Sequence, residues 1–222
     1  MKLTVLPAST PPSSTGMSRK VPPAPSPIWP AVSLPQAYTF PAATARLCAR
    51  PAETEVFAPE RMEDQEPFFE LVDRYCEAQE IPIKGALCEF APGQFEINLG
   101  HGADMLAAAD QGVMLKRCIK AAARATGQRA TFMAKPYAEQ SGSGLHVHLS
   151  LVDAEGRNLF GQTEHGELLL RHAVRGLQDL MAESMLLFAP NANGYRRLRP
   201  MTYAPTAPTW GWNNRTVALR IP

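Results

Sequence analysis

Proline is unevenly distributed along this chain, and its distribution limits where regular structure can form. Residues 1–59 hold 12 of the 21 prolines, and the first acidic residue is Glu53. Because proline lacks an amide donor and fixes φ, the sequence Pro-Pro-Ala-Pro-Ser-Pro at 22–27 cannot continue a helix or an inner strand. We therefore predict a largely disordered, proline-rich tail over residues 1–59 and a folded domain over residues 60–222.

The composition of this tail leaves two origins open. An acid-poor segment with serine and arginine is typical of an organelle transit peptide, but its prolines would interrupt the amphipathic helix that such a peptide forms. A tail of no specific function, from a misassigned start or a disrupted reading frame, fits the residues better.

Charge and cysteine content exclude several classes of protein. The net charge of +1 argues against a nucleic-acid partner. No apolar run approaches membrane-spanning length, so we expect no membrane partner. The cysteines, Cys48, Cys76, Cys88 and Cys118, form no Cys-x-x-Cys pair, so we expect reduced thiols and a cytoplasmic location.

Residues 60–222 alternate between helical and strand patterns. In the first helical stretch, Phe68, Leu71, Val72 and Tyr75 recur at helical spacing. Apolar periodicity predicts helices over 66–78, 103–125 and 167–188, and strands over 83–90, 95–99, 130–135, 144–152 and 216–221. The irregular alternation predicts an α+β fold with a largely antiparallel sheet.

Two glutamates flank a Pro-Gly sequence in Glu-Phe-Ala-Pro-Gly-Gln-Phe-Glu, residues 89–96. If Pro92-Gly93 is a two-residue hairpin turn, Glu89 lies directly opposite Glu96, with Cβ atoms about 5 Å apart. Carboxylates this close repel each other, and a divalent cation with oxygen ligands would relieve the repulsion. The alternative is a solvated face on which the two side chains bend apart. A type II Pro-Gly turn also matches the twist of a hairpin poorly.

Two histidines follow a glycine-rich sequence in Gly-Ser-Gly-Leu-His-Val-His-Leu-Ser-Leu, residues 142–151. Strand alternation directs the aliphatic residues to the core and places His146, His148 and Ser150 together on the other face. Neutral imidazole is a metal ligand, and glycines let a ligand approach the backbone, so this face suits a metal ion beside a phosphate. A surface strand with incidental histidines is the alternative. The sequence is not a P-loop, because no Lys-Ser/Thr follows the glycines.

Arginines concentrate near the C-terminal end of the sequence. Arg196, Arg197 and Arg199 follow Asn-Gly-Tyr, and Arg215 and Arg220 lie at the final predicted strand. Guanidinium groups match carboxylate and phosphate geometry and remain charged at working pH. Neighbouring asparagines and tryptophans favour a polar cleft, and ordinary surface charge is the alternative.

Four motifs resemble, in order, those of the glutamine synthetase catalytic domain. They are the segment 89–96, Lys-Pro at 135–136 with Gly-Ser-Gly-Leu-His-Val-His at 142–148, Asn-Gly-Tyr-Arg-Arg-Leu at 193–198, and Asn-Arg-Thr-Val-Ala-Leu-Arg-Ile-Pro at 214–222. The resemblance covers about residues 62–222. It implies a curved, mostly antiparallel sheet with flanking helices, in an incomplete catalytic domain. It also implies an ATP- and Mg²⁺- (or Mn²⁺-) dependent ligase that joins glutamate to ammonia or an amine through γ-glutamyl phosphate.

The resemblance implies ligand-binding roles for five residues. Glu89 and Glu96 look like ligands of the ion that orders the glutamate site, and His146 looks like a ligand of the ion that bridges the ATP phosphates. His148 and Ser150 look like part of the nucleotide site.

It also implies substrate-binding and catalytic roles. Gly142 resembles the residue whose backbone contacts glutamate, and Arg197 resembles a residue that binds a substrate carboxylate. Arg215 and Arg220 look like catalytic, phosphate-facing arginines that also contact the nucleotide, and Arg215 also contacts substrate. Such roles suit phosphoryl transfer, which depends on positioning and charge neutralisation.

Two residues depart from the glutamine synthetase pattern. Ser141 stands where those enzymes usually have asparagine, and Tyr203 stands where they usually have a glutamate that binds and deprotonates ammonium. A neutral phenol does neither well. The pattern is closer to the γ-glutamyl-polyamine branch, whose nucleophile is putrescine or a related amine.

Several parts of the family pattern have no counterpart in this sequence. The β-grasp domain, the Glu-x-Glu strand before the first helix, and a later strand with a metal-binding glutamate and a substrate arginine are missing. Family sites also form between neighbouring subunits of a homo-oligomeric ring. We therefore expect this polypeptide alone to be nearly inactive, and apolar faces exposed by the missing elements to make it poorly soluble.

Two alternatives to a ligase remain open. The first is a non-catalytic remnant or pseudoenzyme that at most binds nucleotide or a full-length relative. The second is a hydrolase that uses Glu89, Glu96 and His146 with a metal-bound water. The ordered arginine motifs disfavour the hydrolase.

Overall fold

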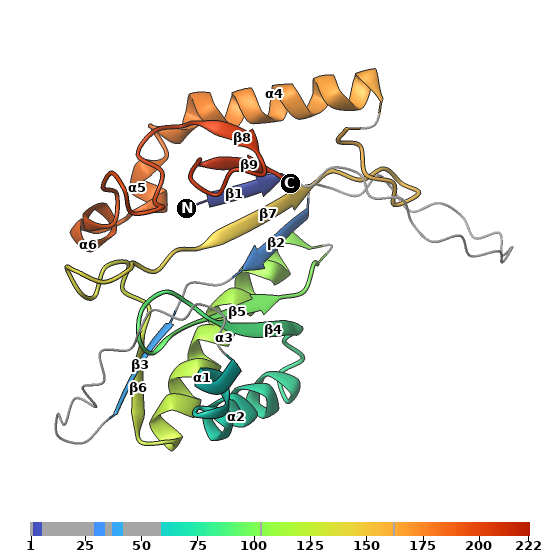
Figure 1. Ribbon diagram of the computed structural model, residues 1–222. Coiled ribbons are helices and arrows are strands. Elements are labelled where there is room, and N and C mark those ends of the chain that lie inside the picture. Colours follow the sequence, from blue (N-terminus) through green and yellow to red (C-terminus); the bar gives the residue numbers. More distant parts are fainter. Residues whose placement is uncertain (1, 6–28, 34–36, 42–58, 103, 162) are drawn as a thin grey trace, which may run out of the picture.

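The structure, a computed structural model, describes residues 59–102, 104–161 and 163–222 in full, together with the backbone of 2–5, 29–33 and 37–41. A nine-stranded sheet runs in the order β6-β3-β5-β2-β7-β1-β9-β8, with β4 paired to β5 (Figure 1). The strands are β1 Lys2–Val5, β2 Trp29–Ser33, β3 Ala37–Pro41, β4 Ile83–Cys88, β5 Gln94–Leu99, β6 Gln128–Thr131, β7 His146–Ser150, β8 Trp210–Trp212 and β9 Leu219–Ile221.

Helices cover the two ends of this sheet, as Figure 1 shows. Near β4 and β5 lie α1, α2 and α3, whereas α4 runs past β8 and β9. The helices are α1 Pro59–Glu63, α2 Glu66–Glu77, α3 Met105–Ala125, α4 Glu164–Met181, α5 Met185–Phe188 and α6 Ala192–Arg196. Pairings of β2 with β5 and β7, of β3 with β5 and β6, and of β4 with β5 are antiparallel. The α+β, mostly antiparallel fold is therefore confirmed.

Three strands from residues 1–59 join the sheet, where we predicted a disordered tail. β1 pairs with β7 and β9, β2 pairs with β7, and β3 pairs with β6. The strands of residues 60–222 present open edges, and an extended segment satisfies their backbone donors and acceptors. The prediction is wrong for these three strands. Its remaining part, over 1, 6–28, 34–36 and 42–58, lies outside the described residues, and the domain boundary at residue 60 stays a prediction.

Two apolar clusters fix the helices against the sheet. In the first, α2 buries Phe68, Val72 and Cys76 at four-residue intervals against α3 and the β4–β5 pair. In the second, Leu170 and Val174 of α4 pack with residues of β9 and of the apolar face of β7. The two clusters thus hold the apolar faces of β4, β5, β7 and β9 and leave the other face of those strands available for polar side chains.

Local capping sets where the two long helices begin. The Asp104 carboxylate accepts hydrogen bonds from the amides of Leu106 and Ala107, at 2.8 and 3.1 Å, and starts α3. The Thr163 hydroxyl accepts one from the Gly166 amide at 3.0 Å and starts α4. Among the helices that the structure describes, none is both long and apolar enough to cross a bilayer.

Several element boundaries differ from the predictions. The helix predicted over 167–188 is divided into α4 and α5. The last strand begins at Leu219 rather than Thr216, because the Asn214 side chain accepts hydrogen bonds from the Thr216 amide and hydroxyl and holds a turn there. Neither β8 nor α6 was predicted, since elements of three and five residues are too short to show a period.

Candidate functional site

A cavity of about 550 Å³ lies where the β4–β5 hairpin, β7, the end of α6 and β9 meet. It brings together side chains that are far apart in the sequence. Seven of the nine residues predicted to bind metal, substrate or nucleotide line it: Glu89, Glu96, His146, His148, Arg197, Arg215 and Arg220. Ser150 and Gly142, which were also predicted, are not part of its lining.

The hairpin that carries the two glutamates has a different register from the one predicted. Leu87, not Glu89, is the partner of Glu96. The Gln94 amide donates to the Ala91 carbonyl at 3.0 Å, and the Glu89 amide donates to the Gln94 carbonyl at 2.9 Å. The prediction that Glu89 lies directly opposite Glu96 is therefore wrong.

The physical reason is the turn. Gly93 has φ of 69°, as the third residue of a type II turn requires, so Ala91–Gln94 form the turn. A type II turn matches the twist of paired strands poorly, and the ladder closes only at Glu89 and Gln94. The loop is two residues longer than a two-residue hairpin connection. Glu89 then faces Gln94. Glu96 lies two residues after Gln94, on the same face of β5, so the two glutamates are diagonal neighbours.

The two carboxyl groups nevertheless interact. Burial, followed by the charge of Glu89 and a hydrogen bond to it, raises the pKa of Glu96 from 4.5 to about 7. Asn98 and Arg215 act in the opposite direction without offsetting these effects. The pair therefore keeps, up to about pH 7, a proton that an isolated glutamate releases near pH 4.5.

This pair fits a divalent cation. Two close, partly buried carboxylates supply oxygen ligands and lack a full countercharge, which such an ion provides. His146 lines the same cavity. Within the described part of the chain, however, no three His, Cys, Asp or Glu side chains are close enough to hold one ion. The structure thus supports a two-carboxylate site and does not join His146 to it.

Arg197 is positioned by two glycines. Burial lowers the pKa of its guanidinium. A Cβ at Gly144 would lie 2.6 Å from the Arg197 Nη1, and one at Gly142 would lie 2.7 Å from its Cγ. Gly142 therefore makes room for the stem of Arg197, and Gly144 for its charged end.

Two amide side chains hold the loops of the site together, and the sequence pattern predicted a role for neither. The Asn193 side chain accepts from the Lys135 amide at 2.8 Å and donates to the Lys135 carbonyl at 2.9 Å. The buried Gln94 side chain accepts from the Ala91 amide at 3.1 Å and donates to the Gly142 carbonyl at 3.3 Å. Both pairs lie within the quoted motifs, so their position in those motifs was the available signal.

The remaining cations lie around His148. Burial, then Arg220 and His101, lower the pKa of His148, so the neutral imidazole is favoured. Burial and the neighbouring Arg215 also lower the pKa of Arg220. Two arginines, a neutral imidazole and two carboxylates line one cavity, and such a set suits an anionic ligand bound beside a metal ion.

Tyr203 lines the same cavity, as the sequence comparison with the glutamate of related enzymes anticipated for this position. Its ring stacks on Phe90, with centroids 5.8 Å apart and planes inclined by 27°. Its backbone φ is 55°, which is uncommon for a residue other than glycine. The chain therefore places an aromatic, neutral side chain beside the hairpin that carries the glutamates.

Comparisons with known proteins show which family this chain is similar to. Residues 31–222 match the family model of the glutamine synthetase catalytic domain. The chain is 43% identical over 174 residues to gamma-glutamylputrescine synthetase of Escherichia coli, covering 78% of this chain and 37% of that protein. It is 38% identical over 152 residues to glutamate–isopropylamine ligase of a Pseudomonas species, covering 67% and 33% of the two chains.

A solved structure shows the same fold. Apo GmaS without ligand superposes with a TM-score of 0.75 at 28% sequence identity, covering 89% of this chain and 47% of that one. The chain thus spans between about a third and half of the length of the relatives that it matches.

Proposed function

Because this chain belongs to the glutamine synthetase family, we propose that its 550 Å³ cavity is the site of ATP-dependent γ-glutamyl amide formation from glutamate and ammonia or an amine. The convergence of the Glu89–Glu96 pair, His148 and the arginines in one cavity carries this proposal. Each element of the cavity contributes a type of group that phosphoryl transfer to a carboxylate uses.

In this proposal the two carboxylates bind the metal ion. Glu89 and Glu96 would hold Mg²⁺ or Mn²⁺, with His146 facing the same space toward the nucleotide. When bound, the ion supplies positive charge for phosphate oxygens. Glu96 must release its proton to act as a full ligand, so its raised pKa makes metal binding depend on pH near neutrality.

The arginines and His148 bind the anionic substrates in this proposal. Arg215 and Arg220 would bind phosphate oxygens and stabilise charge on the group being transferred, and His148 would contact the nucleotide. Arg197, held over the glycines at 142 and 144, would bind a carboxylate of glutamate. Gly142 contributes through its backbone and by leaving space, whereas Ser150 lies outside the cavity lining and receives no role.

The amine is proposed to be putrescine or a related compound rather than ammonia. Tyr203 offers an aromatic face and no carboxylate at the position where ammonia-using relatives are expected to have glutamate. Cation–π attraction can hold an alkylammonium group against a phenol ring. Similarity to gamma-glutamylputrescine synthetase and to glutamate–isopropylamine ligase supports an alkylamine nucleophile.

ADP release by the purified chain tests this proposal, with glutamate and ATP present and with either ammonia or putrescine added. Release that depends on putrescine supports the polyamine branch. Binding of a fluorescent ATP analogue, measured in the same preparation, is expected to be saturable and magnesium-dependent. Arg220→Gln should abolish that binding. Arg175→Gln, which changes an exposed side chain of α4 outside the cavity, should leave it unchanged.

A non-catalytic role is a second candidate, and one observation favours it. The described residues provide no three-ligand metal cluster. Nucleotide binding without ADP release in the presence of either amine would support this candidate.

Exposed apolar side chains suit contact with further protein subunits. Leu186, Leu187 and Met201 are 70%, 80% and 99% exposed, in keeping with a ring of cytoplasmic subunits.

A further inference from the structure

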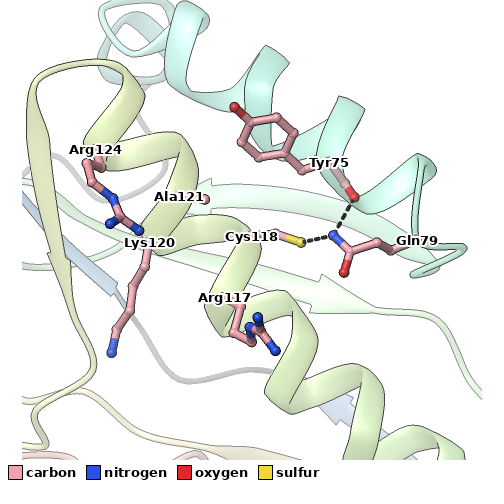
Figure 2. A pocket seen from close by; sticks show the side chains of 7 residues that line it. All are labelled: Tyr75, Gln79, Arg117, Cys118, Lys120, Ala121 and Arg124. Atoms are coloured by element: carbon pink, nitrogen blue, oxygen red, sulfur yellow. Dashed lines mark hydrogen bonds between the residues drawn. The ribbon is translucent and has the colours of Figure 1, made fainter.

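A second cavity, of about 420 Å³, opens between α2 and α3 and shares no lining residue with the candidate ligase site. Figure 2 shows its lining, in which the sulfur of Cys118 lies between the two helices. The lining comprises Tyr75, Gln79, Arg117, Cys118, Lys120, Ala121 and Arg124. Only 2% of Cys118 is exposed, so the cavity reaches a thiol that is otherwise covered.

The Gln79 side chain is aimed at this sulfur. Its Nε2 lies 3.0 Å from the Cys118 Sγ and 3.0 Å from the Tyr75 carbonyl oxygen (Figure 2). A carbonyl oxygen can only accept, so the amide nitrogen, and not the amide oxygen, must face it. The same nitrogen therefore directs an N–H at the Cys118 sulfur, and a donor in this position stabilises negative charge that develops there.

A second thiol contacts the same sulfur. Cys76, buried in α2, is hydrogen-bonded to Cys118 of α3. Burial, followed by the neighbouring Cys118, raises the pKa of Cys76 to about 12. Cys76 therefore keeps its proton and is the donor of this hydrogen bond, so the Cys118 sulfur accepts from both Cys76 and Gln79.

The mouth of the cavity is basic. Arg117, Lys120 and Arg124 are exposed on one face of α3, and none of the lining residues is acidic. None of the three cations takes part in an ion pair found within the described ranges. Cys118 belongs to the apolar cluster between α2 and α3, and the Gln79 donor and this basic rim are the polar groups beside it. Cationic surroundings with hydrogen-bond donors are the setting in which cysteine acts as a nucleophile.

We propose that Cys118 and Cys76 form a peroxide-reactive thiol pair, in which Cys118 reacts first and Cys76 then closes a disulfide between α2 and α3. The inference is independent of the proposed ligase function. Its chemistry needs only a small peroxide that fits the 420 Å³ cavity.

The reaction balances with hydrogen peroxide as the oxidant. The Cys118 sulfur attacks one peroxide oxygen, the O–O bond breaks, and the departing oxygen leaves as water with the thiol proton, which produces a sulfenic acid. The Cys76 sulfur then attacks the Cys118 sulfur, the S–O bond breaks, and a second water leaves with the Cys76 proton. Two thiols are oxidised to one disulfide, and one peroxide is reduced to two waters.

Peptide mass spectrometry of the full chain tests this sequence of events. Cys48, which lies outside the described residues, is first replaced by serine so that three thiols remain. After peroxide treatment and alkylation in denaturant, we expect a linked Cys76–Cys118 peptide. Buried Cys88 should stay fully alkylated as an internal control. Dimedone should trap a sulfenic acid on Cys118 in the Cys76→Ala variant, and none on Cys76 in the Cys118→Ala variant.

The role of the Gln79 donor is tested by rate. Gln79→Ala should slow sulfenic acid formation on Cys118 about threefold to tenfold, because the sulfur loses a donor that stabilises its negative charge. Gln178→Ala, which removes an amide that donates to the Pro208 carbonyl from α4, should leave the rate unchanged. Circular dichroism on each variant reports whether the fold is kept.

Three results would overturn the proposal. The first is full alkylation of both thiols after peroxide treatment of the folded chain, a measurement that needs neither Cys76→Ala nor Cys118→Ala. The second is a disulfide that involves Cys88, and the third is a stable sulfenic acid on Cys118 that Cys76 never resolves.

Discussion

The guanidinium of Arg197 lies directly over Gly144, so that a Cβ at this glycine would come within 2.6 Å of Nη1. The clash is with the far end of a long side chain, which can move aside. Gly144→Ala should therefore leave the free energy of unfolding within about 1 kcal/mol of the parent. It should also displace Arg197 and weaken glutamate binding. Denaturant unfolding and glutamate titration measure the two effects, and an unchanged affinity would contradict the role given to Arg197.

Gly142 should respond differently, because part of its surroundings cannot move. A Cβ there would lie 2.6 Å from the Ala134 carbonyl oxygen, which belongs to the backbone. Gly142→Ala should lower the free energy of unfolding by about 1–3 kcal/mol. Gly176→Ala is the matched control, since its Cβ meets nothing within 4 Å in α4 and should stabilise by about 0.5–1 kcal/mol. Equal stability of the two variants would show that the glycine loop is not packed as described.

Stability without divalent metal should fall as the pH rises toward neutrality. Unfolded Glu96 releases its proton near 4.5, whereas folded Glu96 keeps it to about 7, so the folded state binds more protons between these values. The contribution is present below pH 4.5 and is lost as the pH rises through about 7. Chemical unfolding in a chelating buffer should show this decline. Glu96→Gln should flatten it, and added Mg²⁺ should reverse it; a decline that persists in Glu96→Gln would assign it to another group.

Asn193 should contribute measurably to the position of α6. Asn193→Ala removes both hydrogen bonds to Lys135 and should cost about 1–3 kcal/mol of unfolding free energy. Asn193→Asp is the sharper control, because it keeps the acceptor for the Lys135 amide and removes the donor to the Lys135 carbonyl. An aspartate variant as unstable as the alanine variant would mean that the donor carries the whole contribution.

Tyr203 should govern the choice of amine. Tyr203→Glu introduces a carboxylate that attracts ammonium and accepts its proton, so activity should shift from putrescine toward ammonia. Tyr203→Phe keeps the ring that stacks on Phe90 and should retain the preference for putrescine. ADP release with each amine measures the shift. Where the chain alone releases no ADP, the same substitutions in a full-length relative with this tyrosine make the comparison.

Sequence periodicity was enough to predict much of the architecture. The helical spacing of Phe68, Leu71, Val72 and Tyr75 predicts the apolar face of α2, because each apolar side chain must leave water on the same side. Phe68 and Val72 are fully buried there, together with Cys76, which was not part of the predicted pattern. Alternation likewise predicts that His146 and His148 share a face of β7, since a strand turns successive side chains to opposite sides. These patterns are local, and local backbone geometry is sufficient to interpret them.

Register and long-range pairing were decided only in the folded molecule. The type II turn at Ala91–Gln94 shifts Glu96 from a position opposite Glu89 to a diagonal one, and no periodicity distinguishes the two, because both keep the side chains on one face. The pairing of Asn193 with Lys135 and the contact of Arg197 with Gly144 join segments more than 50 residues apart. Which segments meet depends on how the apolar faces of the sheet and helices pack together, and this packing is a property of the whole chain.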